Sequence, residues 1–412
     1  MPAHLVPDDL AALRRPPERP PPVPEPPVSI TIVRDADGLA RHAEALDDLA
    51  RDLADANVYY EPWFALPLLR AFGADQDLVF LLMSAPDADG APRLIGFFPF
   101  ERRHLHRFAP LPCLRLWRDP FLYVPRCNPL VRTGAADACC AALLDWLEHA
   151  PDSPGLLDLP RLTGDTTFAR ALECRLAAGQ TLRHVRLTQD SHLYRRQADA
   201  DAYLKTALSG ERRQTLRRKR RHLDKLGPVE FTDIGDDGGG DGDVDAAIDG
   251  LFDLEASGWK GTDGTAIASL GHREVIRAVL HAAHARGRLS LLGLRVGGRL
   301  VAARSAFLAP PGSFVFKIGY DEREPYARSS PGFLLEEEAI RRLHAADART
   351  ADGLAWQDTC SAPTSTLFRA MRSDPLPIAR HLVAVRGGPA AALLALVPHA
   401  RRVRRMVRRA PP

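Results

Sequence analysis

The chain has 412 residues, of which 45% are hydrophobic and 26% charged, proportions that exclude a disordered chain and indicate an ordinary globular protein. This length exceeds that of one usual domain, so two or three domains are expected. The formal net charge of +3, from 55 Lys and Arg against 52 Asp and Glu, is too small to name a polyanionic partner by itself.

Residues 1–28 are proline-dense, which predicts an extended tail or a docking linker, because proline interrupts helices and sheet ladders. The pattern becomes globular at residue 29. Apolar periodicity and turn residues then define a first series of elements. The predicted strands are 30–33, 78–84, 93–101, 155–159, 184–187 and 192–195, and the predicted helices are 39–53, 135–149 and 167–178.

A similar order of elements recurs after Arg196. The predicted elements are a basic helix at 200–226, a strand at 229–234, a Gly/Asp loop at 235–243, helices at 244–257 and 272–285, a hairpin at 289–308 that turns on Gly297-Gly298, a strand at 314–321, a helix from 331 and a strand at 353–359. We therefore expect an α/β (α+β) protein of two similar modules, 29–190 and 191–385, each with a mixed central sheet flanked by helices, and a tail at 386–412.

The stretch 313–343 gives the best indication of a ligand site. Alternation over 314–321 predicts a strand with one apolar face, and Gly319 inside it is typical of a bulge or of the close approach of a backbone or ligand. Ser330 fits the N-cap and Pro331 the first position of the next helix. The free backbone N–H groups of 330–333, beside Gly332, form a natural anion cradle; the plainer alternative is a capped helix without a ligand.

Four motifs carry a resemblance to a known family: LEASGWKG (254–261), FKIGYDE (316–322), SPG (330–332) and QDTCSAP (357–363). The chain resembles the GNAT-type acetyltransferases grouped with cellulose-biosynthesis proteins (CelD/BcsL-like), whose relatives include the Fem-like aminoacyl transferases. The resemblance covers most of 190–385, whereas 29–190 shares the order of elements alone.

This resemblance implies tandem GNAT-like modules, in which central strands part and hold the pantetheine arm of acetyl-CoA or another acyl-CoA. The sequence departs from the usual glycine-rich pyrophosphate loop, of which Gly332 alone remains. The residues that the resemblance assigns to the acyl-CoA are Lys317, Ile318, Gly319, Ser330, Pro331, Gly332 and Phe333.

Acyl transfer needs a base, donors for the developing oxyanion and a proton for the departing thiolate. Asp321 is the first candidate base, because it ends the central strand where the sheet is expected to open, and Glu255 is the second. Tyr320 and Tyr326 are the candidate proton donors. The alternative is that Asp321 is a solvated strand end and Glu255 part of a surface ion pair.

Four further residues are candidates for substrate binding. Trp259 and Lys260 are placed to wall an acceptor pocket, although a tryptophan after a helix is often a core residue. Arg304, like Lys317, is a cation inside an apolar strand, where it faces either solvent or an anion. Asp358 lies in the QDTCSAP motif, while Cys360 beside it is predicted to be structural, because a neighbouring carboxylate disfavours the thiolate.

The six cysteines show no CxxC pair and no zinc-type spacing with histidine, which predicts a reducing compartment and no metal site. No apolar run approaches the roughly 20 residues of a membrane span, and the N-terminus lacks a signal-peptide core, so a cytoplasmic protein is expected. The basic helix at 211–225 predicts either a solvated surface or a polyanion contact. The end of the chain, apolar at 390–397 and arginine-rich at 401–409, predicts either a peripheral contact with an anionic membrane surface or a disordered tail.

The leading functional prediction is an acyl-CoA-dependent N- or O-acyltransferase that moves an acetyl group to a small-molecule or polysaccharide-linked acceptor, as in exopolysaccharide or cellulose biosynthesis. Two alternatives stay open. One is an aminoacyl-tRNA-dependent transferase, for which the basic helix contacts tRNA, the one nucleic acid expected. The other is a non-catalytic scaffold of a polysaccharide-assembly complex, with the two ends of the chain as docking arms.

Overall fold

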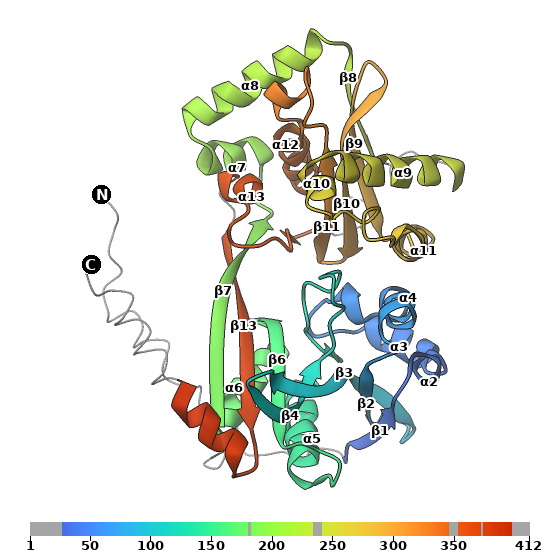
Figure 1. The fold of residues 1–412 in the computed structure, drawn as a ribbon, viewed down its shortest axis with the longest axis vertical. Helices are drawn as coiled ribbons and strands as arrows, with labels where there is room; N and C mark the ends of the chain where they lie inside the picture. Colours follow the sequence, from blue (N-terminus) through green and yellow to red (C-terminus); the bar gives the residue numbers. More distant parts are fainter. Residues whose placement is uncertain (1–26, 180–182, 234–240, 346–352, 372–373, 398–412) are drawn as a thin grey trace, which may run out of the picture.

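The computed structural model describes residues 27–179, 183–233, 241–345, 353–371 and 374–397 (Figure 1). Two runs of strands and helices follow each other along the chain. The first run comprises β1 (Ser29–Val33), α2 (Ala36–Ala40), α3 (Ala43–Ala50), η1 (Val58–Tyr60), α4 (Pro62–Phe72), β2 (Asp77–Pro86), β3 (Pro92–His106), β4 (Ala109–Leu116), β5 (Leu130–Val131), α5 (Ala136–His149), β6 (Leu156–Thr163), α6 (Thr167–Ala178) and β7 (Arg183–Arg195).

The second run comprises α7 (Ala200–Ala207), α8 (Gly210–Asp224), β8 (Val229–Asp233), α9 (Asp241–Ser257), α10 (Trp259–Thr262), α11 (Arg273–His284), β9 (Leu289–Val296), β10 (Arg299–Ala309), β11 (Gly312–Tyr320), η2 (Ala327–Ser329), α12 (Pro331–His344), β12 (Trp356–Asp358), α13 (Thr366–Ala370) and β13 (Asp374–Ala384). The described fold is therefore mixed α/β, with helices on a large mixed sheet, as the sequence predicts.

The described strands form one sheet of 13 strands, in the order β1-β2-β3-β4-β6-β13-β7-β12-β11-β10-β9-β8, with β5 beside β3. The last strand of each run lies in the other run's part of the sheet, because β13 pairs with β6 and β7 pairs with β12. Figure 1 shows β7 and β13 side by side, joining an upper and a lower part. We call β1–β6 with α2–α6 the first half, and α7–β12 the second half. The boundary expected near residue 190 falls inside β7.

Several predicted elements differ from the observed ones for local reasons. The basic helix predicted at 200–226 is broken into α7 and α8, because the Ser209 side chain accepts the N–H of Arg212 and caps a new helix. The hairpin of β9 and β10 is present as predicted, with positive φ at both Gly297 and Gly298. Strands β4 and β13 have no counterpart in the prediction, and each contains two prolines.

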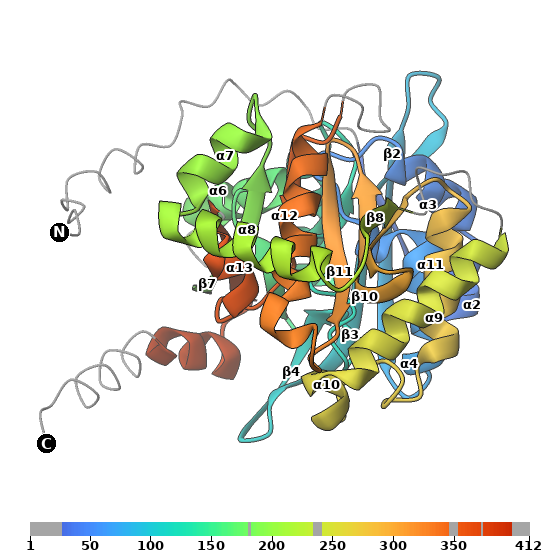
Figure 2. The same ribbon diagram turned by 90° about the horizontal axis from the view of Figure 1, so that it is seen from above.

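Helices cover both faces of the second half. Figure 2 shows α7, α8 and α12 on one side of β9–β11 and α9 and α11 on the other. The core on the second side continues into the first half, where Phe64 of α4 packs edge-to-face against Phe307 and Phe316, with ring centroids 5.5 and 6.1 Å apart. This shared aromatic core is one of the contacts that hold the two halves together, in addition to the pairing of β7 and β13.

The two ends of the chain are described in part. Residues 1–26 and 398–412 lie outside the described residues, so the predictions for the proline-rich and arginine-rich stretches stay predictions. Residues 389–397 form a helix whose Leu394 is buried in a small apolar cluster with Leu382 and Leu156. The apolar part of the expected tail therefore packs on the sheet. Within the described ranges, no helix is long and apolar enough to cross a membrane.

Candidate active site

Strands β11 and β12 separate after a short parallel pairing. They are in register at three residue pairs, from Gly312–Trp356 to Phe314–Asp358. Beyond this point β11 continues to Tyr320 along β10, and a cavity of about 510 Å³ lies at the opening. Its lining comes from the second part of β11, from residues 359–368, from the start of α10, and from residues 122–125 of the first half. The cavity is therefore built by both halves.

A bulge in β11 determines which side chains face the first half. The register with β10 shifts between Ser305 and Ala306, which leaves Phe316 as the extra residue on β11. Both Phe316 and Lys317 consequently contact Tyr123: the rings of Phe316 and Tyr123 are 6.1 Å apart, and the Lys317 Nζ lies 4.7 Å above the Tyr123 ring.

Gly319 marks a close approach of two backbones. A Cβ at this position would lie 2.6 Å from the backbone nitrogen of Glu255, so the glycine lets the end of α9 pack directly on β11. The bulge falls at Phe316 rather than at Gly319. For this reason the prediction of a single apolar face over 314–321 is wrong.

Two lysines that line the cavity, Lys260 and Lys317, contact one buried carboxylate behind it. Glu255 is 2% exposed, and its Oε1 lies 2.9 Å from Lys260 Nζ and 3.8 Å from Lys317 Nζ. Its Oε2 accepts the backbone N–H of Ile267 at 3.0 Å. Lys260 also donates to the backbone oxygen of Ile318 at 3.0 Å. Two ammonium groups therefore share one carboxylate.

This arrangement shifts the protonation of both partners. Burial raises the pKa of Glu255, but Lys260 and then Lys317 outweigh it, and the net result is a lowered pKa. Burial lowers the pKa of Lys317 to about 8, with Glu255 acting in the opposite direction. Glu255 thus stays ionised near neutral pH, whereas Lys317 gains and loses its proton at a pH close to neutral. A partly buried lysine with a lowered pKa that lines a cavity is a typical catalytic candidate.

The first half contributes a tyrosine and its partner. The Tyr123 hydroxyl lies 3.0 Å from Nδ1 of His272, and the rings of Phe72 and Phe121 pack around His272. Burial raises the pKa of Tyr123 and lowers that of His272, so a neutral phenol is hydrogen-bonded to a neutral imidazole. Sequence reasoning missed Tyr123, because it lies in no motif and reaches the cavity from the other half.

Asp321, the first candidate base, lies outside the cavity lining. Its carboxylate is 1% exposed and accepts hydrogen bonds from the side chains of Arg299 and Arg323 and from the Arg323 N–H, at 2.9 to 3.1 Å. Burial raises its pKa, but the bonds from Arg323 and Arg299 outweigh burial and lower it. A carboxylate tied to two arginines is a weak base, so the geometry favours Lys317 over Asp321.

The two candidate proton donors differ in position. Tyr320 lines the cavity together with Trp259, and burial raises the pKa of its phenol. Tyr326 packs under the guanidinium of Arg299, 5.3 Å away, and is not a lining residue. Trp259 is 52% exposed at the cavity rim, and its backbone N–H is held by Glu322 at 3.0 Å.

The start of α12 is covered by the basic helix α8. Ser330 adopts a left-handed conformation, with φ of 47°, and makes no side-chain cap. Its hydroxyl instead accepts a hydrogen bond from Lys219 of α8. The ring Nδ1 of His222, also on α8, lies 2.7 Å from the hydroxyl of Ser329.

The residues predicted to cradle a diphosphate are packed inside the fold. Pro331 and Gly332 are buried, and a Cβ at Gly332 would lie 2.6 Å from Cδ1 of Tyr320. The Phe333 N–H is bonded to the Ser330 oxygen at 2.9 Å. The described lining of the cavity contains none of these four residues. Gly332 therefore provides room for Tyr320, and the predicted cradle is closed.

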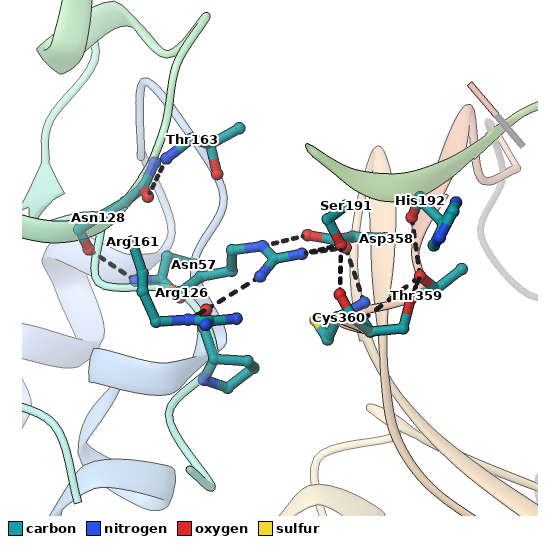
Figure 3. Close-up of polar contacts among 12 residues, drawn as sticks. Asn57, Arg126, Asn128, Arg161, Thr163, Ser191, His192, Asp358, Thr359 and Cys360 are labelled. Atoms are coloured by element: carbon teal, nitrogen blue, oxygen red, sulfur yellow. Dashed lines mark hydrogen bonds and ion pairs between the residues drawn. The ribbon is translucent and has the colours of Figure 1, made fainter. Parts of the chain in front are cut away.

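Arg304 and Asp358, two predicted substrate ligands, hold the fold together instead. Arg304 Nε lies 3.0 Å from Oε2 of buried Glu336, and its Nη2 donates to Gln357. Asp358 accepts two hydrogen bonds of 2.7 Å from Arg126 of the first half (Figure 3). Both pairs are buried, so these groups are not free to bind a substrate.

Cys360 follows Asp358 and has the structural character predicted for it. Its N–H donates to Asp358 at 2.8 Å, and its thiol lies 3.2 Å from the hydroxyl of Tyr59. Burial raises the pKa of the Cys360 thiol to about 12. A larger cavity, of about 550 Å³, reaches the other side of the Arg126–Asp358 pair, but its described lining contains no lysine or histidine. The cavity of about 510 Å³ beside Lys317 is therefore the better active-site candidate.

Comparisons with known proteins support the fold class. Residues 210–358 match the family model described as an acetyltransferase (GNAT) domain, so the second half has the fold of GNAT acyltransferases. A crystal structure of FemX is similar at a TM-score of 0.51 and 10% identity, covering 86% of this chain and 98% of that one. A crystal structure of a conserved protein of unknown function from Bacteroides thetaiotaomicron VPI-5482 is similar at a TM-score of 0.50 and 11% identity, covering 84% of this chain and 97% of that one. Identities this low show the fold alone. No curated protein matches the chain significantly.

Proposed function

We propose that the chain is an acyltransferase whose reaction takes place where β11 and β12 separate. The observation that carries this proposal is Lys317, a partly buried side chain in the opening that lies between Glu255 and Tyr123 and has a pKa of about 8. The fold class supports an acyl-transfer reaction, and the cavity supplies a group that accepts and returns a proton near neutral pH.

Lys317 has two tasks in this mechanism. In its neutral form it removes a proton from the acceptor's amine or hydroxyl as that group attacks the acyl carbonyl carbon. Lys317 then carries this proton as an ammonium and delivers it to the leaving atom of the donor when the acyl bond breaks. Glu255 holds Lys317 at the opening, and Lys260 fixes both Glu255 and the Ile318 carbonyl.

The leading donor is acetyl-CoA or another acyl-CoA. The end of the β11–β12 pairing supports it, because an extended amide-containing arm can bind along a strand edge by main-chain hydrogen bonds. The residues at the start of α12 do not fit the diphosphate, because Gly332 is packed against Tyr320. The acceptor, which is a small-molecule or glycan-linked amine or alcohol, and a role in exopolysaccharide or cellulose synthesis belong to this proposal.

A second candidate donor is an aminoacyl-tRNA. The observation in its favour is helix α8, which covers the start of α12 and carries exposed Arg217, Arg218 and Arg221. A basic helix at this place suits a large polyanion. Reversing these three arginines to glutamate is expected to remove salt-sensitive binding of tRNA and to leave acetyl-CoA binding unchanged.

Filling the cavity tests the location of the reaction. Ala362 is an exposed residue on the cavity rim, and Ala362→Trp is expected to reduce acetyl-CoA affinity at least 10-fold in calorimetry, because the indole occupies the opening. The matched control is Ala362→Ser, which keeps the opening free and is expected to bind like the wild type. Wild-type affinity and turnover in Ala362→Trp would place the reaction elsewhere.

A further inference from the structure

Another cavity, of about 290 Å³, lies between the first half and the strands β7 and β13, and it is rich in arginine. Its charged lining residues are Arg115, Arg118, Arg161 and Arg380. It lies where β4 and β6 separate, since these strands pair in parallel at Leu114–Leu157 and Arg115–Asp158 and then part. The position corresponds to the opening between β11 and β12. The first half thus has its own opening, with different chemistry.

The arginines of this cavity outnumber the carboxylates that neutralise them. Asp158 is fully buried and accepts hydrogen bonds from Arg115 at 2.6 Å and from Arg380 at 2.7 and 2.8 Å. The described lining contains four arginines and no carboxylate, and Asp158 bonds two of the four. Both bonded arginines keep further N–H groups for another acceptor.

Arg118 and Arg161 carry the excess charge. Arg161 donates through Nε to the backbone oxygen of Pro125 at 2.6 Å, and this bond holds the guanidinium at the cavity. Within the described part of the chain, neither the Nη groups of Arg161 nor the guanidinium of Arg118 has a hydrogen-bonded acceptor. Burial, and then the charge of Arg126, lowers the pKa of Arg161. The positive charge of Arg118 and Arg161 therefore favours an anion at this cavity.

We propose that this cavity binds a phosphoryl group. Several guanidinium groups around one small cavity match the multiple acceptor oxygens of a phosphate or diphosphate. Gln189 on the rim, on the same face of the sheet as Arg380, adds a neutral donor. The carbonyl that Arg161 holds belongs to Pro125, which also lines the cavity next to Lys317, so the phosphoryl group lies close to that cavity. The proposal does not depend on acyl transfer.

Calorimetry of the full chain with inorganic phosphate and with pyrophosphate at low ionic strength tests the site. Arg118→Gln and Arg161→Gln are each expected to weaken pyrophosphate binding at least 10-fold. The matched control is Arg70→Gln, which removes the same charge from an exposed pair with Asp37. Equal affinities in all three variants, or no binding to the wild type, would overturn the proposal.

A substitution at an exposed residue tests the same site with less effect on folding. Gln189 is exposed on the rim and lies on the same face of the sheet as Arg380, because the two strands pair at Gln189–Ile378 and Leu187–Arg380. Gln189→Glu therefore places a carboxylate beside the arginines and is expected to abolish pyrophosphate binding without affecting the fold. Binding that survives this change also overturns the proposal. Titration of the Arg118→Gln variant with CoA identifies which molecule carries the phosphoryl group. Reduced CoA affinity supports a site for the phosphates of the donor. Unchanged CoA affinity with lost pyrophosphate binding supports a site for a phosphorylated acceptor or free phosphate.

Discussion

The ammonium of Lys317 lies 4.7 Å above the ring of Tyr123, although these residues belong to different halves of the sheet. The tyrosine face attracts a cation and offsets part of the cost of burying it. Glu255 supplies the opposite charge from α9 at 3.8 Å. The candidate active site is therefore a composite, in which one half provides the proton-transfer group and the other closes the cavity around it.

The first prediction concerns the pH dependence of acyl transfer. The charged groups that act on Lys317 are Glu255, Lys260 and Asp119. Because the neutral amine is the base, the single-turnover rate of the wild type is expected to rise with pH and level off above about pH 8. Lys317→Arg keeps the charge but does not deprotonate, so the rate should fall about 100-fold or more at neutral pH. An arginine variant with near-normal rates and the same pH profile would exclude Lys317 as the base.

The second prediction separates Glu255 from Asp321. Glu255→Gln removes the anion that supports the charge of Lys317, so the midpoint of the rate profile is expected to move below pH 8. Asp321→Asn breaks bonds to Arg299 and Arg323 and should reduce thermal stability while leaving that midpoint in place. The measurement is the single-turnover rate of each folded variant across pH 6 to 10, a range of about two units on either side of pH 8. A large loss of rate for Asp321→Asn alone would return the base role to Asp321.

Local patterns in the sequence predict much of this structure. The sequence predicts the turn on Gly297-Gly298 and the strand, loop and helix of 313–343. These elements are predictable because glycine, proline and the alternation of apolar residues act over a few neighbouring positions. Strands β4 and β13 were hidden, because two prolines in each are typical of loops, and the long-range pairing of these strands overrides that local signal.

The candidate site was predictable in part. Glu255, Lys260 and Lys317 lie in motifs of the second half, and the structure brings them together. Tyr123 was not predictable, since its approach depends on how the two halves pack. A glycine in the first turn of a helix has two explanations: it leaves room for a ligand, or it leaves room for a neighbouring side chain. The sequence of 330–333 does not distinguish between them. The structure favours the second explanation at Gly332.

The third prediction tests that explanation of Gly332 through the sign of a stability change. Alanine in an open helical position stabilises a protein by about 0.5–1 kcal/mol relative to glycine. Here its Cβ would lie 2.6 Å from the Tyr320 ring, so Gly332→Ala is expected to lower the free energy of unfolding by about 1–3 kcal/mol. Denaturant unfolding measures this change, and Tyr320→Leu in the same chain should restore part of the loss. A stabilised Gly332→Ala variant would show that the start of α12 is open.

The fourth prediction concerns the buried pair of Arg126 and Asp358, which joins the first half to β12. Their side chains are 1% and 2% exposed and make two hydrogen bonds of 2.7 Å. Asp358→Asn leaves the Arg126 charge buried without its counterion, so the free energy of unfolding should fall by about 3–5 kcal/mol.

Replacing both partners with apolar residues, as in Arg126→Met with Asp358→Leu, removes the uncompensated charge, so the double variant should be more stable than the Asp358→Asn chain. The control is the exposed pair of Arg70 and Asp37, whose disruption should cost about 0–1 kcal/mol. Urea unfolding followed by tryptophan fluorescence gives all of these values. If Asp358→Asn costs no more than the exposed control, the Arg126–Asp358 pair does not hold the two halves together, and the pairing of β7 with β13 and the shared aromatic core around Phe64 do so without it.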